Sequence, residues 1–236
     1  MKSTFRPRLF VPLALGGTQI GWLRPELAAR LGEWKQVFSV SSEQVKLLKP
    51  DLLSPVVEAL AKEGFIPGWR NERYRIADRF DIERAAARPF GLNTQAVHLN
   101  GIAGERMWLA RRSATKQIDP GMLDNLVAGG IASGFSVFDT LVKECWEEAG
   151  LPAELARKAK PAGTLNVLRE VPEGVQSETV SIYDLELPED FRPQNQDGEV
   201  SEFKLLAFSE VERETLTYEA ALVAQHYLQR RRARAP

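Results

Sequence analysis

The amino-acid sequence predicts an α/β (α+β) protein of two domains: a small mixed α/β domain over residues 1–90 and an α/β/α sandwich on a mixed sheet over residues 91–236. Three observations support this. The 236 residues suffice for two modest cores, with 44% hydrophobic and 27% charged residues, as in ordinary globular proteins. Helix-like and strand-like segments alternate along the chain. The pattern changes near Pro89, where a charged, alanine-rich stretch ends.

The first domain is predicted to hold two helices and two strands. Pro25–Leu31 begins with a proline that suits a first helical turn, and Asp51–Gly64 begins with Asp51 as its N-cap. The helix Asp51–Gly64 carries an apolar stripe, and Gly64 is expected to end it. Short runs predict strands at Lys35–Val40 and Arg73–Ile76.

The second domain is predicted to combine several strands with two helices. The strands are expected at Thr94–Leu99, Arg106–Ala110, Met122–Val127, Gly163–Leu168, Glu178–Leu187 and Glu202–Phe208. Asn100-Gly101 is a turn signal after the first of them. One helix is expected over Ser136–Ala149, stopped by Gly150, and a last one over Tyr218–Arg230. The arginine-rich end of the chain is expected to be solvated and frayed.

Composition and charge argue against several classes of function. The formal net charge of −1 attracts neither nucleic acid nor an anionic membrane, and neither is expected as a partner. Cys145 is the single cysteine, which excludes an intrachain disulfide and fits a reducing, cytoplasmic location. His98 and His226 are too few for a zinc site built on histidine and cysteine. The apolar stretch Leu9–Leu15 is too short for a signal peptide or a membrane span.

Three glutamates of the helix expected at Ser136–Ala149 form a candidate metal site. On a helical wheel, Glu148 and Glu147 lie roughly 40° and roughly 60° to either side of Glu144. Like charges at this spacing repel by about a few tenths of a kcal/mol per pair. A divalent cation that prefers oxygen ligands, Mg²⁺ or Mn²⁺, would offset the repulsion and keep waters for substrate phosphates. A solvated helix face is the alternative for such an acidic run.

The spacing around these glutamates resembles the Nudix box, G-x5-E-x7-R-E-U-x-E-E-x-G-U, where U is a bulky aliphatic residue. The matching positions are Gly129, Lys143, Glu144, Cys145, Glu147, Glu148, Gly150 and Leu151. The chain thus resembles the Nudix hydrolases, which cleave diphosphates linked to a second group. The resemblance implies a Nudix-type sandwich and a pyrophosphatase that requires Mg²⁺ or Mn²⁺. It also implies metal binding by Glu144, Glu147, Glu148 and the carbonyl of Gly129.

Two positions depart from the box. Phe135 stands where the family has glutamate, and Lys143 where it has arginine. In the family these two side chains support each other behind the metal-binding glutamates. Phe135 cannot do so, and Asp139, one turn before Lys143, is expected to take over that supporting role.

Segments outside the box sharpen the resemblance to one subfamily. They read ARRSATKQIDPGMLDNLVAGG over residues 110–130, DLELP over 184–188 and NQDGEVSEF over 195–203. With an N-terminal extension, they are similar to the thiamine-diphosphate-related Nudix subfamily, sometimes called thiamine pyrophosphokinase-related. This resemblance implies hydrolysis of thiamine diphosphate, or of oxidised analogues, to the monophosphate.

Further residues complete the predicted site. Glu199 and Glu202 are candidates for a late metal ligand or the general base, and the sequence does not choose between them. Arg112 and Lys116 are expected to contact the substrate's diphosphate. Hydrolysis of a nucleotide derivative and a non-catalytic diphosphate-binding module remain alternatives, the latter favoured by Phe135. The partner is a small-molecule diphosphate, and a homodimer is compatible with the sequence.

Overall fold

The computed structural model describes residues 5–234 and divides the chain into two compact units. The first unit holds the chain up to Thr94 together with two later segments, Ala132–Gly134 and Asn166–Thr179. The second unit holds Gln95–Ile131, Phe135–Leu165 and the chain from Val180 onward. The two units therefore interleave along the sequence, and a domain boundary at residue 90 stays a prediction.

The first unit is built on a mixed four-stranded sheet with the order β2-β1-β4-β3. Its strands are β1 (Val11–Leu15), β2 (Thr18–Leu23), β3 (Phe38–Val40) and β4 (Val45–Leu47). β1 pairs antiparallel with β2 and parallel with β4. The helices α1 (Pro25–Leu31) and α2 (Leu53–Lys62) bury their leucines and valines in the same core as the sheet.

A separate two-stranded ribbon completes the first unit. Its strands β5 (Arg73–Ile76) and β6 (Phe80–Glu83) pair antiparallel, with Arg75 opposite Asp81. Ala77 and Asp78, in the turn between them, both have positive φ, which is unusual for residues other than glycine. Because neither position is a glycine, the sequence has no clear turn signal between the two strands. Sequence patterns therefore do not predict β6.

Predictions for the first unit met mixed results. The helix Pro25–Leu31 and the strand Arg73–Ile76 are confirmed. The prediction of Asp51 as an N-cap is wrong, because Asp51 lies inside the 3₁₀ turn Pro50–Leu52, and α2 starts after that turn without a side-chain cap. A proline at the first position of a turn explains the early start.

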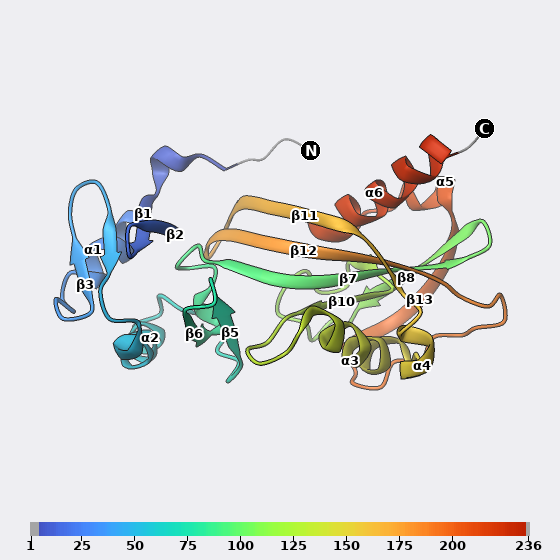
Figure 1. Cartoon of the computed structure of the whole chain (residues 1–236), viewed down its shortest axis with the longest axis horizontal. Helices are drawn as coiled ribbons and strands as arrows, with labels where there is room; N and C mark the ends of the chain where they lie inside the picture. The colour runs from blue at the N-terminus through green and yellow to red at the C-terminus, as the bar shows by residue number, and fades with distance from the viewer. Residues whose placement is uncertain (1–4, 235–236) are drawn as a thin grey trace. The chain divides into compact units, whose positions relative to one another are not determined.

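The second unit is built on most of a seven-stranded sheet with the path β11-β12-β7-β8-β13 (Figure 1). The ends of β11 and β12 within residues 166–179 belong to the first unit. β10 also pairs with β7, and β9 also pairs with β8, both antiparallel. The strands are β7 (Asn93–Ala103), β8 (Arg106–Arg112), β9 (Leu123–Asn125), β10 (Val127–Gly130), β11 (Lys160–Val171), β12 (Gly174–Glu186) and β13 (Val200–Ala207). Five of the six strands predicted for this domain correspond to members of this set, and β7, β11 and β12 are longer than predicted. The single strand predicted at Met122–Val127 is wrong, because the structure has two strands there, β9 and β10, interrupted at Leu126.

The turn predicted at Asn100-Gly101 is wrong, because both residues lie inside β7. Asn100 is fully buried and donates a hydrogen bond to Asp184 (3.0 Å). A Cβ atom on Gly101 would lie 2.2 Å from Leu126 Cδ2, so glycine is needed here for close packing rather than for a turn. The chain reverses instead at Gly104, whose φ is +59°.

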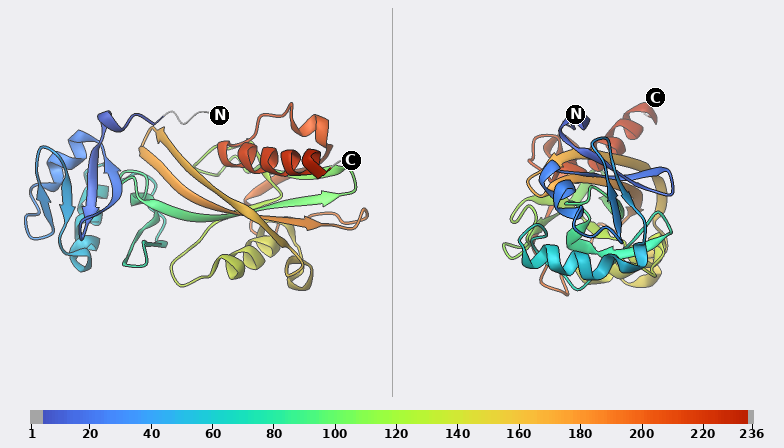
Figure 2. Two further views of the ribbon diagram at one scale, coloured as in Figure 1. Left: turned by 45° about the horizontal axis from the view of Figure 1, so that its top comes forward. Right: turned by 90° about the vertical axis from the view of Figure 1, so that its left-hand side faces the viewer.

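Helices cover both faces of this sheet (Figure 2). The helix α3 (Val137–Ala149) packs on one face and α6 (Tyr218–Arg234) on the other, each over its own apolar cluster. Two short helices, α4 (Ala153–Ala156) and α5 (Phe208–Val211), follow α3 and β13. The α/β/α sandwich predicted for this part is therefore confirmed.

The expectation of a frayed C-terminal end is corrected up to Arg234. α6 continues through that residue, and successive arginines pair with acids elsewhere in the second unit. These pairs are Arg230 with Asp184, Arg231 with Glu105, and Arg232 with Glu212.

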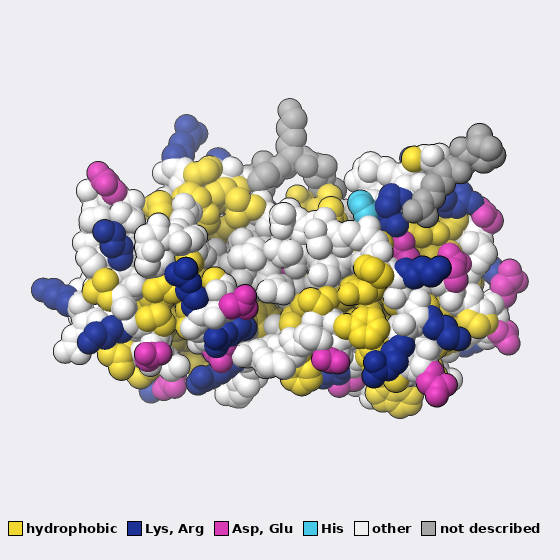
Figure 3. All heavy atoms as spheres, in the orientation of Figure 1, with side chains coloured by type: hydrophobic (Ala, Val, Ile, Leu, Met, Phe, Trp, Pro, Cys, Tyr) yellow, Lys and Arg dark blue, Asp and Glu magenta, His cyan; other side chains and the backbone are white. Residues whose placement is uncertain are grey.

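None of the helices within residues 5–234 is long and apolar enough to cross a membrane. The described atoms in Figure 3 show acidic and basic side chains scattered among apolar ones.

Candidate active site

The helix α3 is fixed at both ends by local signals. Ser136 is the N-cap: its Oγ accepts a hydrogen bond from the backbone N–H of Asp139 (3.1 Å) and donates to the Asp139 carboxylate (2.7 Å). At the other end Gly150 adopts φ +63°, and its N–H and that of Leu151 bond to the last turn of α3. These caps set which residues of α3 face the sheet.

Glu144 of α3 lies against the backbone of β10. A Cβ atom on Gly129 would be 2.5 Å from Glu144 Cγ and 2.9 Å from Oε1, so only glycine leaves room for this carboxylate. The Glu144 side chain is 14% exposed. Burial raises the pKa of Glu144, and the neighbouring ammonium of Lys143 opposes that rise.

Glu148, one turn later, is more deeply buried, with 5% of its surface exposed. Its Oε2 accepts a hydrogen bond from the backbone N–H of Ala128 (2.8 Å). Burial first, and the charge of Glu144 second, raise the pKa of Glu148 to about 8, although the Ala128 hydrogen bond works in the opposite direction. Two repelling carboxylates are thus held side by side against β10.

Glu147 is placed differently from its two neighbours. Its carboxylate pairs with Lys143 one turn earlier, and it is more exposed than Glu144. Lys143 also contacts Glu144 at 3.3 Å. The expected support of Lys143 by Asp139 is corrected, because the Asp139 carboxylate accepts from Ser136 and Lys143 turns to the glutamates that follow it.

The geometry allows a test of whether a divalent cation fits. No group of three or more His, Cys, Asp or Glu side chains within residues 5–234 lies close enough together to hold a metal ion. Glu144 and Glu148 nevertheless supply two buried carboxylates whose mutual repulsion a cation would relieve. Carboxylate oxygens are the hard donors that Mg²⁺ prefers. The donor set therefore fits a divalent cation held by these two glutamates, while ligation by Glu147 and by the Gly129 carbonyl stays a prediction.

A loop over residues 194–199 closes on the C-terminal end of α3. The side-chain amide of Asn195 donates to the backbone carbonyls of Glu147 (3.3 Å) and Glu148 (3.4 Å). The same amide donates to Asp197, and the Asn195 oxygen accepts from the N–H of Gly198 (2.6 Å). Asn195 thus ties the loop to the helix residues that carry the acidic groups.

This loop presents Glu199, whose carboxylate pairs with Lys116. The charge of Lys116 lowers the pKa of both Glu144 and Glu148, although burial outweighs it in each case. Lys116, predicted as a diphosphate contact, therefore acts electrostatically on the two buried glutamates. Glu199 is associated with them through this lysine and through the loop.

Glu202 is on the other side of the sheet from α3. Its carboxylate bonds to Arg111 (2.6 Å), and this hydrogen bond is the main cause that lowers the pKa of Glu202. Successive side chains of β8 point to opposite faces of the sheet. Arg111 therefore shares its face with Met107 and Leu109, which pack under α6. Trp108 and Ala110 point to the opposite face, and Trp108 belongs to the apolar cluster under α3. The structure therefore separates Glu202 from Glu144 and favours Glu199 among the two predicted bases.

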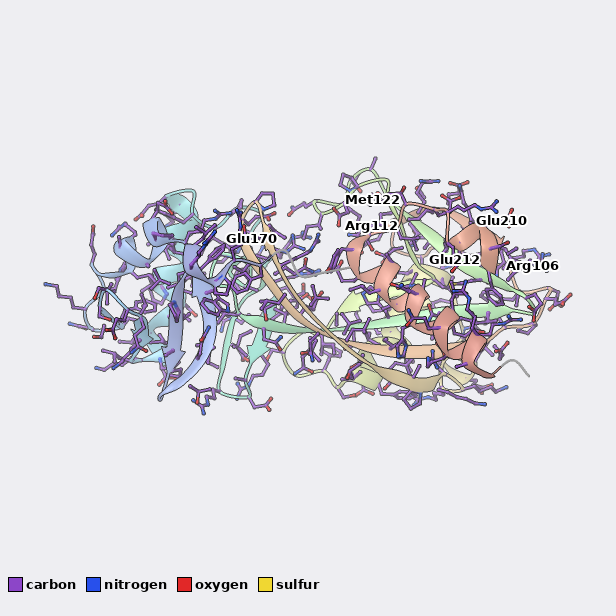
Figure 4. All side chains as sticks on the ribbon, turned by 90° about the horizontal axis from the view of Figure 1, so that it is seen from above. Arg106, Arg112, Met122, Glu170, Glu210 and Glu212 are labelled. Atoms are coloured by element: carbon purple, nitrogen blue, oxygen red, sulfur yellow. The ribbon has the colours of Figure 1, made fainter. Side chains whose placement is uncertain are left out.

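Arg112 is occupied by contacts inside the second unit. Its guanidinium donates to the carbonyl of Ile118 (3.0 Å and 3.1 Å) and to Asp124 (3.0 Å). Its backbone N–H bonds to the carbonyl of Met122, and Figure 4 shows the two residues next to each other. This arrangement gives Arg112 a structural role in its loop and does not favour the predicted contact with a diphosphate.

Sequence patterns missed two polar residues near the buried glutamates. Asp124 is buried, and its charge contributes to the raised pKa of Glu148. Asn195 holds the loop described above. Both lie in segments that resemble the family, DPGMLDN and NQDGEVSEF, but spacing in the sequence cannot reveal that Asn195 bonds to α3 or that the charge of Asp124 acts on Glu148. Cys145 is buried, which raises its pKa to about 12, and the ring of the buried His98 forms a hydrogen bond with Asn125.

Comparisons with known proteins match both parts of this chain. Residues 92–227 match the family described as "NUDIX domain", and residues 1–94 match a "Domain of unknown function (DUF4743)". The proteins "Nudix hydrolase 20, chloroplastic" and "Nudix hydrolase 24, chloroplastic" of Arabidopsis thaliana are each 36% identical to this chain, over 229 and 222 residues. Each alignment covers 86% of this chain and 61% of the plant protein, so the chain spans about three fifths of the length of these relatives.

Among solved structures, the crystal structure of DR0079 from Deinococcus radiodurans is similar in fold. The superposition covers 65% of this chain and 98% of the other, with a TM-score of 0.52 and 20% sequence identity. At this identity the likeness bears on the fold alone.

Proposed function

Since the chain belongs to the Nudix hydrolase family, we propose that it hydrolyses a diphosphate linkage with a bound divalent cation, Mg²⁺ or Mn²⁺. The observation that carries this proposal is the pair of buried carboxylates, Glu144 and Glu148, held against β10. Two carboxyl groups buried in such a place resist ionisation unless something positive favours their charged forms. The opposing charge of Lys116 is not enough to bring the pKa of either glutamate back to its usual value.

The proposed mechanism assigns a task to each group of the site. Glu144 and Glu148 would hold the cation, with Glu147 and the Gly129 carbonyl as further candidates. When bound, a divalent cation neutralises phosphate oxygens and makes a water molecule more acidic. Lys116 attracts the diphosphate as a point charge, and Glu199 removes a proton from the attacking water. Glu202 is the weaker candidate for this base because Arg111 lowers its pKa.

The substrate we propose is thiamine diphosphate, or an oxidised analogue, cleaved to the monophosphate. Support comes from the resemblance of residues 110–130, 184–188 and 195–203 to the thiamine-diphosphate-related Nudix subfamily. A nucleotide derivative is the second candidate substrate. A diphosphate-binding module without activity is disfavoured because Glu144 and Glu148 are retained. A cytoplasmic location and a homodimer stay predictions.

One experiment separates these functions. The purified protein is incubated with Mg²⁺ or Mn²⁺ and a panel of thiamine diphosphate, oxythiamine diphosphate, ADP-ribose and NADH, and monophosphate release is followed. We expect turnover of the two thiamine compounds. Turnover of the nucleotides alone would contradict the thiamine assignment, and no turnover of any compound would favour the binding module.

Variants test the site itself. Glu144→Gln and Glu148→Gln each remove one charge and should reduce turnover by about two orders of magnitude or more, the usual consequence of losing a metal ligand. Glu154→Gln, on the exposed first turn of α4, is the matched control and should leave turnover unchanged. Full activity in Glu148→Gln would refute the metal assignment.

A further inference from the structure

Within the first unit, the β5–β6 ribbon contacts Ser133, which lies in the chain between β10 and α3. Residues 131–136, called the connection below, join the strand that carries Gly129 to the helix that carries Glu144 and Glu148. Three of its residues, Ala132–Gly134, belong to the first unit, although the strand and helix on either side belong to the second. The hydrogen bonds of Ser133 to the β5–β6 ribbon explain why these three residues belong to the first unit.

Ser133 makes two hydrogen bonds to the ribbon. Its backbone N–H donates to the carbonyl of Arg73 in β5 (2.8 Å), and its hydroxyl donates to Oδ1 of Asp81 in β6 (2.8 Å). The first bond extends the ribbon by one residue of the connection. The second is a charge-assisted bond, which is stronger than a bond between neutral groups.

The ribbon is well suited to hold a loop in place. Asp81 is fixed by its strand pairing opposite Arg75 and by a salt bridge to that arginine (3.3 Å). Asp81 and Ser133 are both half-buried, so water competes less for their hydrogen bond. The chain beyond Ser133 is exposed at Gly134, whose φ is +89°, and at Phe135, so the connection has few other restraints there.

We propose that Asp81 and Ser133 are positioning residues for the proposed hydrolysis: they fix the connection so that Glu144 stays packed over Gly129. The inference rests on the proposed function, but its structural part does not depend on activity. A connection released from the ribbon would gain conformational freedom and let α3 shift relative to β10. Because the space over Gly129 is tight, a small shift is enough to disturb the paired carboxylates.

The test compares Asp81→Ala, Ser133→Ala and the double variant in the full chain. Ser133→Ala removes only a hydroxyl and leaves the Asp81–Arg75 salt bridge in place, so it is the milder change. Glu58→Gln is the matched control, because Glu58 lines the same small cavity as Asp81 and has no hydrogen bond to the connection. Asp81→Asn retains an acceptor oxygen and should restore much of the effect lost in Asp81→Ala.

Two quantities are measured: amide hydrogen exchange of peptides spanning residues 131–136, and kcat and KM at varied Mg²⁺ with a hydrolysed substrate. Each single variant should speed exchange in the connection and lower kcat by about tenfold, the effect of losing one charge-assisted hydrogen bond. KM should change by less than about twofold if substrate contacts are intact. The double variant should match Asp81→Ala, because the bond that Ser133→Ala removes is already lost in Asp81→Ala.

The outcomes separate this inference from the proposed function. Unchanged exchange in the connection, or additive effects in the double variant, would overturn the positioning role while leaving the hydrolase proposal intact. Faster exchange spread evenly over the first unit would reveal a merely structural role and would also overturn it. If the wild-type protein hydrolyses no diphosphate, the proposed function fails, and the exchange measurement still decides whether Asp81 holds the connection.

Discussion

Replacing Glu148 by glutamine should stabilise the protein in the absence of metal. In a chelator no cation favours ionisation of this buried carboxyl group, whose pKa is raised from 4.5 to about 8, so it stays mostly protonated at pH 7 in the folded state. An acid with a raised pKa in the folded state makes folding less favourable as pH increases. The destabilisation begins near the unfolded pKa and becomes complete above the folded pKa. Glutamine keeps the shape and an acceptor for the Ala128 N–H without the charge.

The size of the effect follows from the two pKa values. A pH of 7 lies about 2.5 units above the unfolded pKa of 4.5 and still below the folded pKa of about 8. Over these units only the unfolded state loses its proton, and each unit corresponds to about 1.4 kcal/mol of stability. The variant should therefore gain on the order of 3 kcal/mol in the free energy of unfolding at pH 7, and about 1 kcal/mol at pH 5. Such a gain at an active site matches the usual conflict between stability and activity.

The assay is urea denaturation in EDTA at several pH values between 5 and 9, repeated with Mg²⁺. Wild type should become less stable relative to Glu148→Gln as pH rises, and Mg²⁺ should stabilise wild type far more than the variant. Glu154→Gln should match wild type in both conditions to within about 0.5 kcal/mol. A variant less stable than wild type at pH 7 in EDTA, or a difference that does not change with pH, would refute the reasoning.

Three other changes test packing and loop contacts. Gly129→Ala puts a methyl group within 2.5 Å of Glu144 Cγ, so it should lower kcat at least about tenfold and cost about 1–3 kcal/mol in denaturation. Gly101→Ala meets Leu126 at 2.2 Å and should destabilise by a similar amount of about 1–3 kcal/mol, with residual activity followed on the remaining folded protein. Asn195→Ala removes two bonds to α3 and should cost about 1–2 kcal/mol while lowering kcat. An unchanged unfolding midpoint in any of them would contradict the packing argument.

The site helix could be predicted from sequence because its signals are local. Ser136 and Gly150 cap the helix within one turn of its ends, and the spacing of Glu144 and Glu148 decides that both face the same way. Glu147 lies on the other side of Glu144 from Glu148, and its carboxylate pairs with Lys143 instead. A helical wheel predicts the angular positions of these side chains but not the groups that each of them contacts.

The rest depended on contacts between distant segments. The pairing of β13 with β8 shifts by one residue between Val200 and Glu202, and such a shift decides which face a side chain occupies. Nothing in the local sequence reveals it, so Glu199 and Glu202 could not be told apart. Gly101 carried a turn signal, but close packing against Leu126 overrides it.

The interleaving of the two units makes the hydrolase region unsuited to simple excision. The end of the β11–β12 hairpin has its partners upstream of residue 91: Val175 donates to the carbonyl of Arg88 (2.9 Å), and Glu170 pairs with Arg6. A fragment beginning at residue 91 would leave the buried Val171 and Val175 facing water and their backbone groups unmatched. Such a fragment would have exposed, unpaired strand ends that favour aggregation. Low solubility or weak activity of the fragment would then reflect the truncation rather than the chemistry of the site.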